Sequence, residues 1–256
     1  MVSSPPVVAE FGGRLEGLGW VSDLLVAGSL ATGDYLPGVS DLDLVALVDG
    51  PVDNGRRAAL AALHRQLDAD AGREAKLGCV YVDAGRLADV DAKHPTWTHG
   101  LLVQRILSGI SRAELVRHGF AVFGRPPREV LPAMSDDAVR EAARAELTGY
   151  WAWAARRPWI WWDPELADLG LTSMARGRHA LRDGELLTKS AAVERADAPA
   201  WLRDQLRARR RGGNVRSPRL RTALVAWRDA RRTTRQAATR TATPTPDEST
   251  DGRANT

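Results

Sequence analysis

Residues 28–48 read GSLATGDYLPGVSDLDLVALV and form the most informative segment of this chain of 256 residues. A short apolar run at 24–27 precedes the segment, and a second apolar run at 42–48 closes it. Apolar runs of this length that are bounded by Gly, Pro and Asp are typical of strands buried on at least one face. The segment therefore predicts a strand, a loop that contains Gly and Pro, and a second strand.

Two carboxylates open the second predicted strand. Side chains alternate between the two faces of a strand, so Asp41 and Asp43 should project to one side while Leu42 and Leu44 enter the core. Two carboxylates about 7 Å apart on one strand face can share hard divalent cations, and Mg²⁺ is the usual companion of nucleotide phosphates. The pair is thus a candidate metal site, although carboxylates that merely solvate a strand end are the structural alternative.

The Gly28-Ser29 step lies where the first predicted strand ends. Glycine permits close approach of the backbone to a ligand, and serine offers a hydroxyl that suits a phosphate oxygen. Beside a carboxylate pair, this step supplies the parts needed for metal-assisted phosphoryl or nucleotidyl transfer.

The rest of the amino-terminal third fits a mixed α/β sheet. Apolar residues recur at helical spacing across 55–71, and a third strand is expected at 77–82. A strand, a crossover helix and a further strand are the elements of such a sheet.

The carboxy-terminal part of the chain is predicted to be helical. Ser135 is an expected N-cap for a helix in which Val139, Ala142, Ala143, Tyr150 and Trp153 fall on one face. Asp163 opens another helix, with Gly184 as its stop. Further helices are expected near 187–196, 199–210 and 219–232.

The chain as a whole is predicted to be α+β, with an amino-terminal mixed-sheet domain at 1–125 and an α-helical bundle domain at 134–232. Three prolines between residues 126 and 132 mark the boundary. The segment 233–256 contains mostly Thr, Ala, Pro and Gly, together with charged residues, and we expect it to be a disordered tail.

Composition narrows the class of protein further. The single cysteine, Cys79, excludes an intramolecular disulfide framework and a cysteine-based zinc site, so a reducing cytoplasm is the expected location. No apolar run approaches the 18–20 residues or so that cross a membrane, and the first ten residues lack a signal pattern.

The net charge is +4, but 13 arginines lie between Arg203 and Arg240. This stretch favours a solvated helix face with a basic tail; it could touch RNA, but it lacks the interleaved aromatic residues of a sequence-reading surface.

The spaced pair of motifs, Gly28-Ser29 and then Asp41-x-Asp43 on a strand, resembles the DNA polymerase β-like nucleotidyltransferase superfamily. Within it the chain is most similar to the aminoglycoside adenylyltransferases that modify streptomycin and spectinomycin. The resemblance implies an amino-terminal nucleotidyltransferase domain, a helical domain that closes over ATP, and Mg²⁺ as cofactor. Asp41 and Asp43 would be catalytic metal ligands, and Gly28 and Ser29 would bind the nucleotide.

The resemblance also assigns roles outside the first motif. Arg176 and Lys189 correspond to ATP-contacting residues, although each is also explained as surface charge. Trp97 resembles the tryptophan that stacks on the acceptor sugar, and ordinary packing explains it equally simply. Asp168 lies near the acceptor-binding acids, as do Asp163 and Glu165, for which charge at a helix N-terminus is the alternative. His94 and His99 lie five residues apart, and no role is assigned to them.

One position departs from the family pattern. The glutamate that acts there as general base would fall in the strand at 77–82, and Gly78 occupies its place. Glu74 and Asp83 flank this strand, but neither matches the motif. The predicted function is transfer of AMP to a hydroxyl of an aminoglycoside-like small molecule. The alternatives are transfer to RNA or protein, as in toxin-like relatives, and a nucleotide-binding relative without catalysis.

Overall fold

The computed structural model describes residues 4–69 and 75–239. Within these residues six strands form one mixed sheet in the order β5-β4-β3-β2-β1-β6. The central pair β2 and β3 is parallel, and every other neighbouring pair is antiparallel. The strands are β1 (Val21–Val26), β2 (Leu42–Val48), β3 (Leu77–Asp83), β4 (Lys93–Thr98), β5 (Leu101–Ile106) and β6 (Phe120–Phe123).

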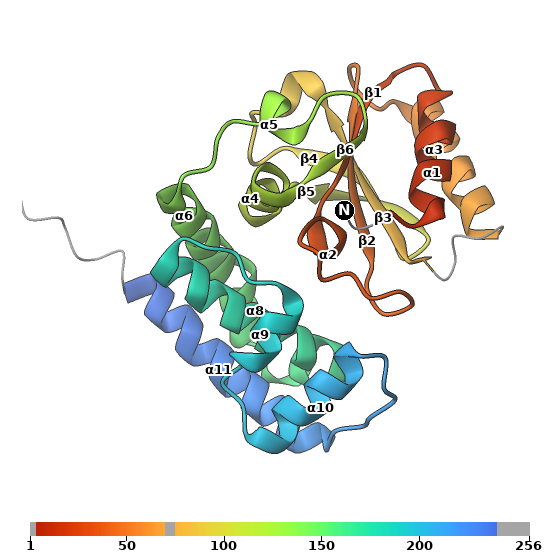
Figure 1. The fold of residues 1–256 in the computed structure, drawn as a ribbon. Coiled ribbons are helices and arrows are strands. Elements are labelled where there is room, and N and C mark those ends of the chain that lie inside the picture. Colours follow the sequence, from red (N-terminus) through yellow and green to blue (C-terminus); the bar gives the residue numbers. More distant parts are fainter. Residues whose placement is uncertain (1–3, 70–74, 240–256) are drawn as a thin grey trace, which may run out of the picture.

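Helices cover both faces of this sheet (Figure 1). Leu42, Leu44 and Tyr81 pack on one face against α1 (Pro6–Glu16) and α3 (Asn54–Leu67). On the opposite face, Val45 and Leu47 pack against α4 (Gly109–His118), with the short helix α5 (Pro127–Val130) nearby. Asp43 belongs to the second face, because side chains alternate along β2.

The three strands predicted from apolar runs are confirmed as β1, β2 and β3, while β4, β5 and β6 were not predicted. The reason is visible at β5, which lies at the edge of the sheet and leaves both ends of the strand exposed. An edge strand of this kind needs no continuous apolar run, so its sequence carries little strand signal. β6 has only four residues, each of them half-buried.

The helices after α5 pack on one another and form the second part of the molecule, drawn below the sheet in Figure 1. α8 begins after its N-cap Asp163 and ends at Gly184 in the left-handed conformation, both as predicted. No helix in the described part of the chain combines the length and apolarity needed to cross a bilayer. The helices are α6 (Asp136–Glu146), α7 (Ala152–Ala155), α8 (Pro164–Asp183), α9 (Lys189–Glu194), α10 (Ala200–Arg210) and α11 (Arg219–Thr239), with a 3₁₀ turn, η5 (Pro158–Trp162), before α8.

The helix predicted from Ser135 onward is interrupted, and this changes which aromatic residues are buried. A π-helical turn, η4 (Leu147–Trp151), separates α6 from α7. The wider π turn displaces the residues after it from the 3.6-residue pattern. Trp151 therefore enters the core, whereas Tyr150 and Trp153, predicted to share a face with Val139, are 51% and 45% exposed.

The predicted start of the disordered tail at residue 233 is also corrected. α11 continues to Thr239, because Thr233, Thr234 and Ala237 are buried and continue the face that packs on the other helices. The remainder of the predicted tail, 240–256, lies outside the described residues.

Candidate active site

The carboxylate pair lies in a cleft between the sheet and the helical part. Asp41 directly precedes β2 and Asp43 is its second residue, and both side chains are exposed. The cleft has a volume of about 960 Å³, and Asp41 and Asp43 line it together with Gly78 from β3 and Glu165 from α8. The two carboxylates share one side of the strand, as the alternation of side chains predicts.

Gly28 holds the backbone against the Asp43 carboxylate. It begins the one-turn helix α2 (Gly28–Ala31) with a φ of +61°, in the left-handed region that favours glycine. A Cβ atom at this position would lie 2.2 Å from Oδ2 of Asp43. The preceding amide, that of Ala27, donates to the Asp43 carbonyl at 2.8 Å and fixes the same contact. Only glycine therefore fits between the first strand and the carboxylate.

Ser29 is buried beside this contact. Its side chain is 5% exposed, and Oγ lies 3.5 Å from the Asp41 carbonyl oxygen. That separation is at the limit of a hydrogen bond, so the hydroxyl is weakly engaged within the protein. The Gly28-Ser29 step and the carboxylate pair, predicted to act together, do lie together.

The Asp43 carboxyl group has an unusual electrostatic environment. It remains open to the cleft, yet the surrounding protein displaces water and raises the pKa of Asp43 to about 6. The positive charge of Lys189 opposes this rise, whereas the negative charges of Asp41 and Glu114 reinforce it. A bound cation would relieve the repulsion between these carboxylates.

Arg176 and Lys189 approach the pair from the helical part. Lys189 is the first residue of α9 and makes no hydrogen bond or ion pair within residues 4–69 and 75–239. Arg176 lies in α8, forms an ion pair with Glu114 of α4, and donates to the Leu187 carbonyl at 3.0 Å. Both positive charges act on Asp43. Glu114 was not predicted, because a single glutamate within an amphipathic helix carries no sequence signal.

Comparison with known protein families bears on the Gly-Ser step and the carboxylate pair together. Residues 10–82, which include the Gly-Ser step and both aspartates, match the family model described as "Nucleotidyltransferase domain". This part of the chain is thus similar to nucleotidyltransferase domains. The chain is accordingly an enzyme of the nucleotidyltransferase kind, as the sequence predicted.

A solved structure supports the fold of the whole chain. Spectinomycin adenyltransferase AAD(9) from Enterococcus faecialis, determined with ATP and spectinomycin, has 15% sequence identity and a TM-score of 0.65. The similarity covers 88% of this chain and 98% of that one. It confirms the α+β fold and the predicted likeness to aminoglycoside adenylyltransferases. No curated protein matches the sequence.

Trp97 is buried on the far side of the nucleotidyltransferase sheet. It is 3% exposed, and its ring stacks on His64 of α3 with ring centroids 4.6 Å apart. α3 covers the face opposite to Asp43, so the ring points away from the carboxylate pair. One face of the ring is thus occupied by packing, while Trp97 also contributes to the lining of the cleft that contains the carboxylate pair, and its role toward the acceptor stays a prediction.

Asp168 is held within the helical part rather than presented to the cleft. Its two carboxylate oxygens accept from Nε and Nη2 of Arg209 at 2.6 and 2.9 Å. Desolvation at this half-buried position raises the pKa of Asp168, and the Arg209 ion pair lowers it. The acid of α8 that lines the cleft is instead Glu165, one turn earlier.

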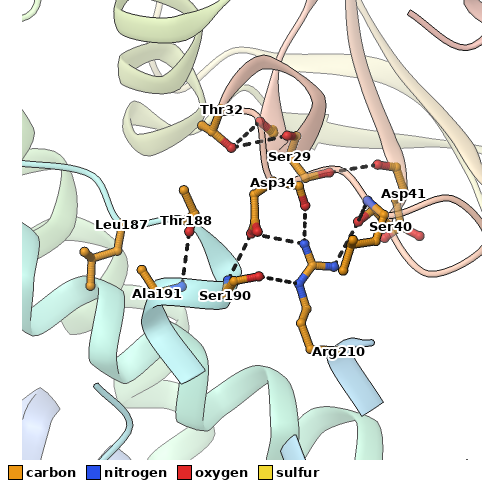
Figure 2. Close-up of polar contacts among 12 residues, drawn as sticks. Ser29, Thr32, Asp34, Ser40, Asp41, Leu187, Thr188, Ser190, Ala191 and Arg210 are labelled. Carbon is orange, nitrogen blue, oxygen red and sulfur yellow. Dashed lines mark hydrogen bonds and ion pairs between the residues drawn. The ribbon is translucent and has the colours of Figure 1, made fainter. Parts of the chain in front are cut away.

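An ion pair joins the helical part to the loop between Ser29 and Asp41. Figure 2 shows Arg210, at the end of α10, pointing toward Asp34 and Ser40. Arg210 pairs with the Asp34 carboxylate at 3.1 Å and donates to Ser40 Oγ at 2.9 Å. The Ser190 amide of α9 also donates to Asp34, at 2.9 Å. Desolvation of Asp34 opposes these contacts, but together they lower the pKa of its carboxyl group.

Several arginines of the basic stretch after residue 203 have partners inside the protein. Arg209 and Arg210 make the contacts described above, and Arg207 pairs with Glu194 and Asp204. Part of the positive charge that the sequence concentrates here is therefore neutralised locally. Nothing in these contacts requires a nucleic-acid partner.

The chemistry of the donor set fits a hard cation. Asp41 and Asp43 offer carboxylate oxygens, the ligand type that Mg²⁺ prefers. In the described residues, no group of three or more His, Cys, Asp or Glu side chains forms a complete metal site. A cation at this pair would therefore need further oxygen ligands, which nucleotide phosphates and water provide.

Proposed function

We propose that this chain is an ATP- and Mg²⁺-dependent adenylyltransferase that transfers AMP to a hydroxyl group of an aminoglycoside-like small molecule and releases pyrophosphate. One observation carries the proposal: Asp41 and Asp43 line a single cleft beside the Gly28 backbone, with Lys189 and Arg176 acting from the other domain. The expected compartment is the cytoplasm, in keeping with a free, buried Cys79.

The residues of the sheet wall would bind the metal and the phosphates. Asp41 and Asp43 would hold Mg²⁺, which when bound would neutralise charge that develops on the reacting phosphate. The close-packed backbone at Gly28 and the weakly engaged hydroxyl of Ser29 offer donors to phosphate oxygens. Their position beside the metal ligands is what a polyphosphate chain requires.

The residues of the helical wall would act on the leaving group. Lys189 has no partner among the described residues, and its charge already acts on Asp43. An ammonium group there would stabilise the negative charge that accumulates on pyrophosphate as it departs. Arg176 would add to that charge if its pairing with Glu114 is shared with the triphosphate.

The acceptor would occupy the remainder of the cleft. Glu165 and Asp68 contribute carboxylates to its lining, and Arg65, Lys76 and Arg105 contribute positive charge. A neighbour of the same fold is known with ATP and spectinomycin, which supports an acceptor of this chemical class. Modification of such a drug would confer antibiotic resistance.

The test is incubation of the purified chain with α-labelled ATP, Mg²⁺ and a panel of aminoglycosides and aminocyclitols. The expected result is labelled AMP on one of the drugs, with one pyrophosphate released for each transfer. Conversion of both Asp41 and Asp43 to asparagine should abolish the transfer; transfer that survives this change would contradict the mechanism.

Two controls separate the alternatives. Label on tRNA or protein added to the same panel, with none on a drug, would replace the proposed acceptor by a macromolecule. ATP binding by calorimetry without pyrophosphate release for any acceptor would indicate a non-catalytic relative.

A further inference from the structure

Gly78 leaves an open position next to Asp43. The two residues are paired in the parallel register of β2 and β3, so they face the same side of the sheet. A Cβ atom at Gly78 would meet only the Trp97 and Leu42 carbonyl oxygens, at 3.5 and 3.8 Å. These are ordinary van der Waals distances, so a Cβ atom would fit here, but glycine has no side chain.

Asp83, at the other end of β3, does not fill this position. It shares a face with Cys79 and Tyr81, which pack under α1 and α3, so it faces away from Asp43. Its carboxylate accepts a hydrogen bond from the Gly85 amide and caps the following turn. A proton acceptor for the reaction must come from another element.

The next strand brings Thr98 beside the open position and His99 into the same cleft. Cys79 pairs with Trp97 in the antiparallel register of β3 and β4, and continuing this register by one residue sets Thr98 beside Gly78. Neighbouring strands are about 4.8 Å apart, so the backbone at Thr98 lies about 10 Å across the sheet from that of Asp43. Thr98 and His99 both line the cleft that contains the carboxylate pair.

The geometry of the β4–β5 turn holds the His99 ring. His99 and Gly100 have φ angles of 49° and 75°, the signs that a two-residue type I′ hairpin turn requires. Thr98 Oγ1 lies 2.9 Å from His99 Nδ1. When Nδ1 donates its proton to this oxygen, the lone pair of Nε2 is left free to accept one.

We propose that His99 is the general base of the reaction, oriented by Thr98 and working in the space that Gly78 leaves open; this rests on the proposed function. As the acceptor oxygen forms its bond to the α-phosphorus, its proton passes to Nε2 of His99. The bond from the α-phosphorus to the bridging oxygen breaks, and its electron pair leaves with pyrophosphate. No other reactant is needed.

Other titratable groups face the same cleft. Glu165 lies in the first turn of α8, on the opposite wall of the cleft. Asp68 faces the cleft from the end of α3. Arg65 faces it from α3, Lys76 from the residue before β3, and Arg105 from β5.

The first test is His99→Asn. Asn-Gly is a preferred sequence for this turn, so the hairpin should be retained. The kcat for AMP transfer should fall about 100-fold, and the acid limb of the kcat/KM profile between pH 5 and 8 should disappear. The Kd for ATP measured by calorimetry should not change. His118→Asn, at an exposed histidine of α4 outside the cleft lining, is the control and should leave both measurements unchanged.

The second test restores a base at the open position. Gly78→Glu in the His99→Asn background should recover at least 10-fold in kcat, with an acid limb at lower pH, because glutamate ionises at lower pH than histidine. Gly78→Ala in the same background should recover nothing. Thr98→Val should lower kcat by a smaller factor than His99→Asn and leave the KM for ATP unchanged, as expected of a positioning residue.

The outcomes separate this inference from the proposed function. If the wild-type protein transfers AMP and His99→Asn retains its kcat and pH profile, the inference is overturned and the proposed function stands. If Glu165→Gln removes the acid limb and His99→Asn does not, Glu165 is the base. If the wild-type protein modifies no acceptor, both proposals are overturned.

Discussion

The two walls of the cleft differ in how the chain builds them. The sheet wall places Gly28, Ser29, Asp41 and Asp43 from one strand-loop-strand segment, held by short-range backbone contacts. The helical wall is contributed by Glu165, and behind it Lys189 and Arg210 come from two further helices. Its contacts to the sheet domain, such as Arg210 to Asp34, span long sequence separations. The sheet wall is therefore a local structure, whereas the helical wall depends on how the two parts dock.

The largest effect should come from the sheet wall. Asp43→Asn should lower AMP transfer by about 1,000-fold, because it removes a carboxylate that would bind the metal. Initial rates with saturating ATP and Mg²⁺ measure the loss. Asp49→Asn, at the residue that follows β2, is the matched control and should retain full activity. Equal loss in both variants would mean that β2 responds to charge removal in general.

Gly28→Ala should be next in size. The added Cβ would meet the Asp43 carboxylate at 2.2 Å, so the loop or the carboxylate must move, and we expect a loss of about 100-fold in kcat/KM. Gly33→Ala is a well-matched control: Gly33 also has a positive φ, of 71°, but its Cβ would have nothing within 4 Å. If only Gly28→Ala loses activity, the cause is the contact with Asp43 and not the backbone strain that both variants share. Similar losses in Gly28→Ala and Gly33→Ala would show that backbone strain is sufficient.

Asp34→Ala should weaken the docking of the helical part on the loop between Ser29 and Asp41. This change leaves Arg210, 11% exposed, without its carboxylate, at a cost of about 3 kcal/mol and about 8 °C in Tm. The KM for ATP should rise about tenfold, because Asp34 lies in the loop between Ser29 and Asp41. Asp204→Ala, which removes an exposed partner of Arg207, should change Tm by no more than about 1 °C.

The same variant predicts a pH dependence. The pKa of Asp34 is lowered in the folded protein, so its contribution to stability is present above the ordinary pKa of an aspartate and is lost as the pH falls through the folded value. The difference in Tm between wild type and Asp34→Ala should therefore shrink below about pH 4. A difference that stays constant down to pH 3 would show that packing, and not charge, holds the loop.

The smallest effect concerns the stability of the sheet wall without metal. The pKa of Asp43 is raised to about 6, so the folded protein binds this proton more tightly than the unfolded chain, and stability falls as the pH rises through that range. In the presence of a chelator, Asp43→Asn should raise Tm by about 3 °C at pH 8, after allowance for solvent at this accessible carboxylate. The gain should vanish below about pH 4, and added Mg²⁺ should stabilise only the wild type.

The sequence predicted most of the sheet wall because its signals are local. The spacing of Gly28-Ser29 and Asp41-x-Asp43, together with alternation along a strand, was sufficient to bring these four residues together. The N-caps of α6 and α8 could also be predicted from the sequence, because Ser135 and Asp163 each accept a hydrogen bond from an amide within three residues of their own position. Three strands of the sheet were identified by their apolar runs.

The sequence did not reveal contacts made across the fold. Trp97 matched a family pattern, yet the pleat of β4 turns its ring toward His64. Arg210 is one arginine in a run of them, and only the docking of α10 on the loop before β2 distinguishes it. The π turn at Leu147–Trp151 has no sequence signature. Because of this turn, Trp151 is buried while Tyr150 and Trp153 are exposed.

The sequence by itself determined a mixed sheet that carries a carboxylate pair beside a Gly-Ser turn, followed by a set of helices. Those features depend on backbone periodicity and on contacts between residues close in the chain. Only the tertiary structure decided which charges of the helices reach Asp43 and which acid of α8 lines the cleft. It also brought His99 into the cleft that contains Asp43 and Gly78, because strand register joins residues that no local pattern relates.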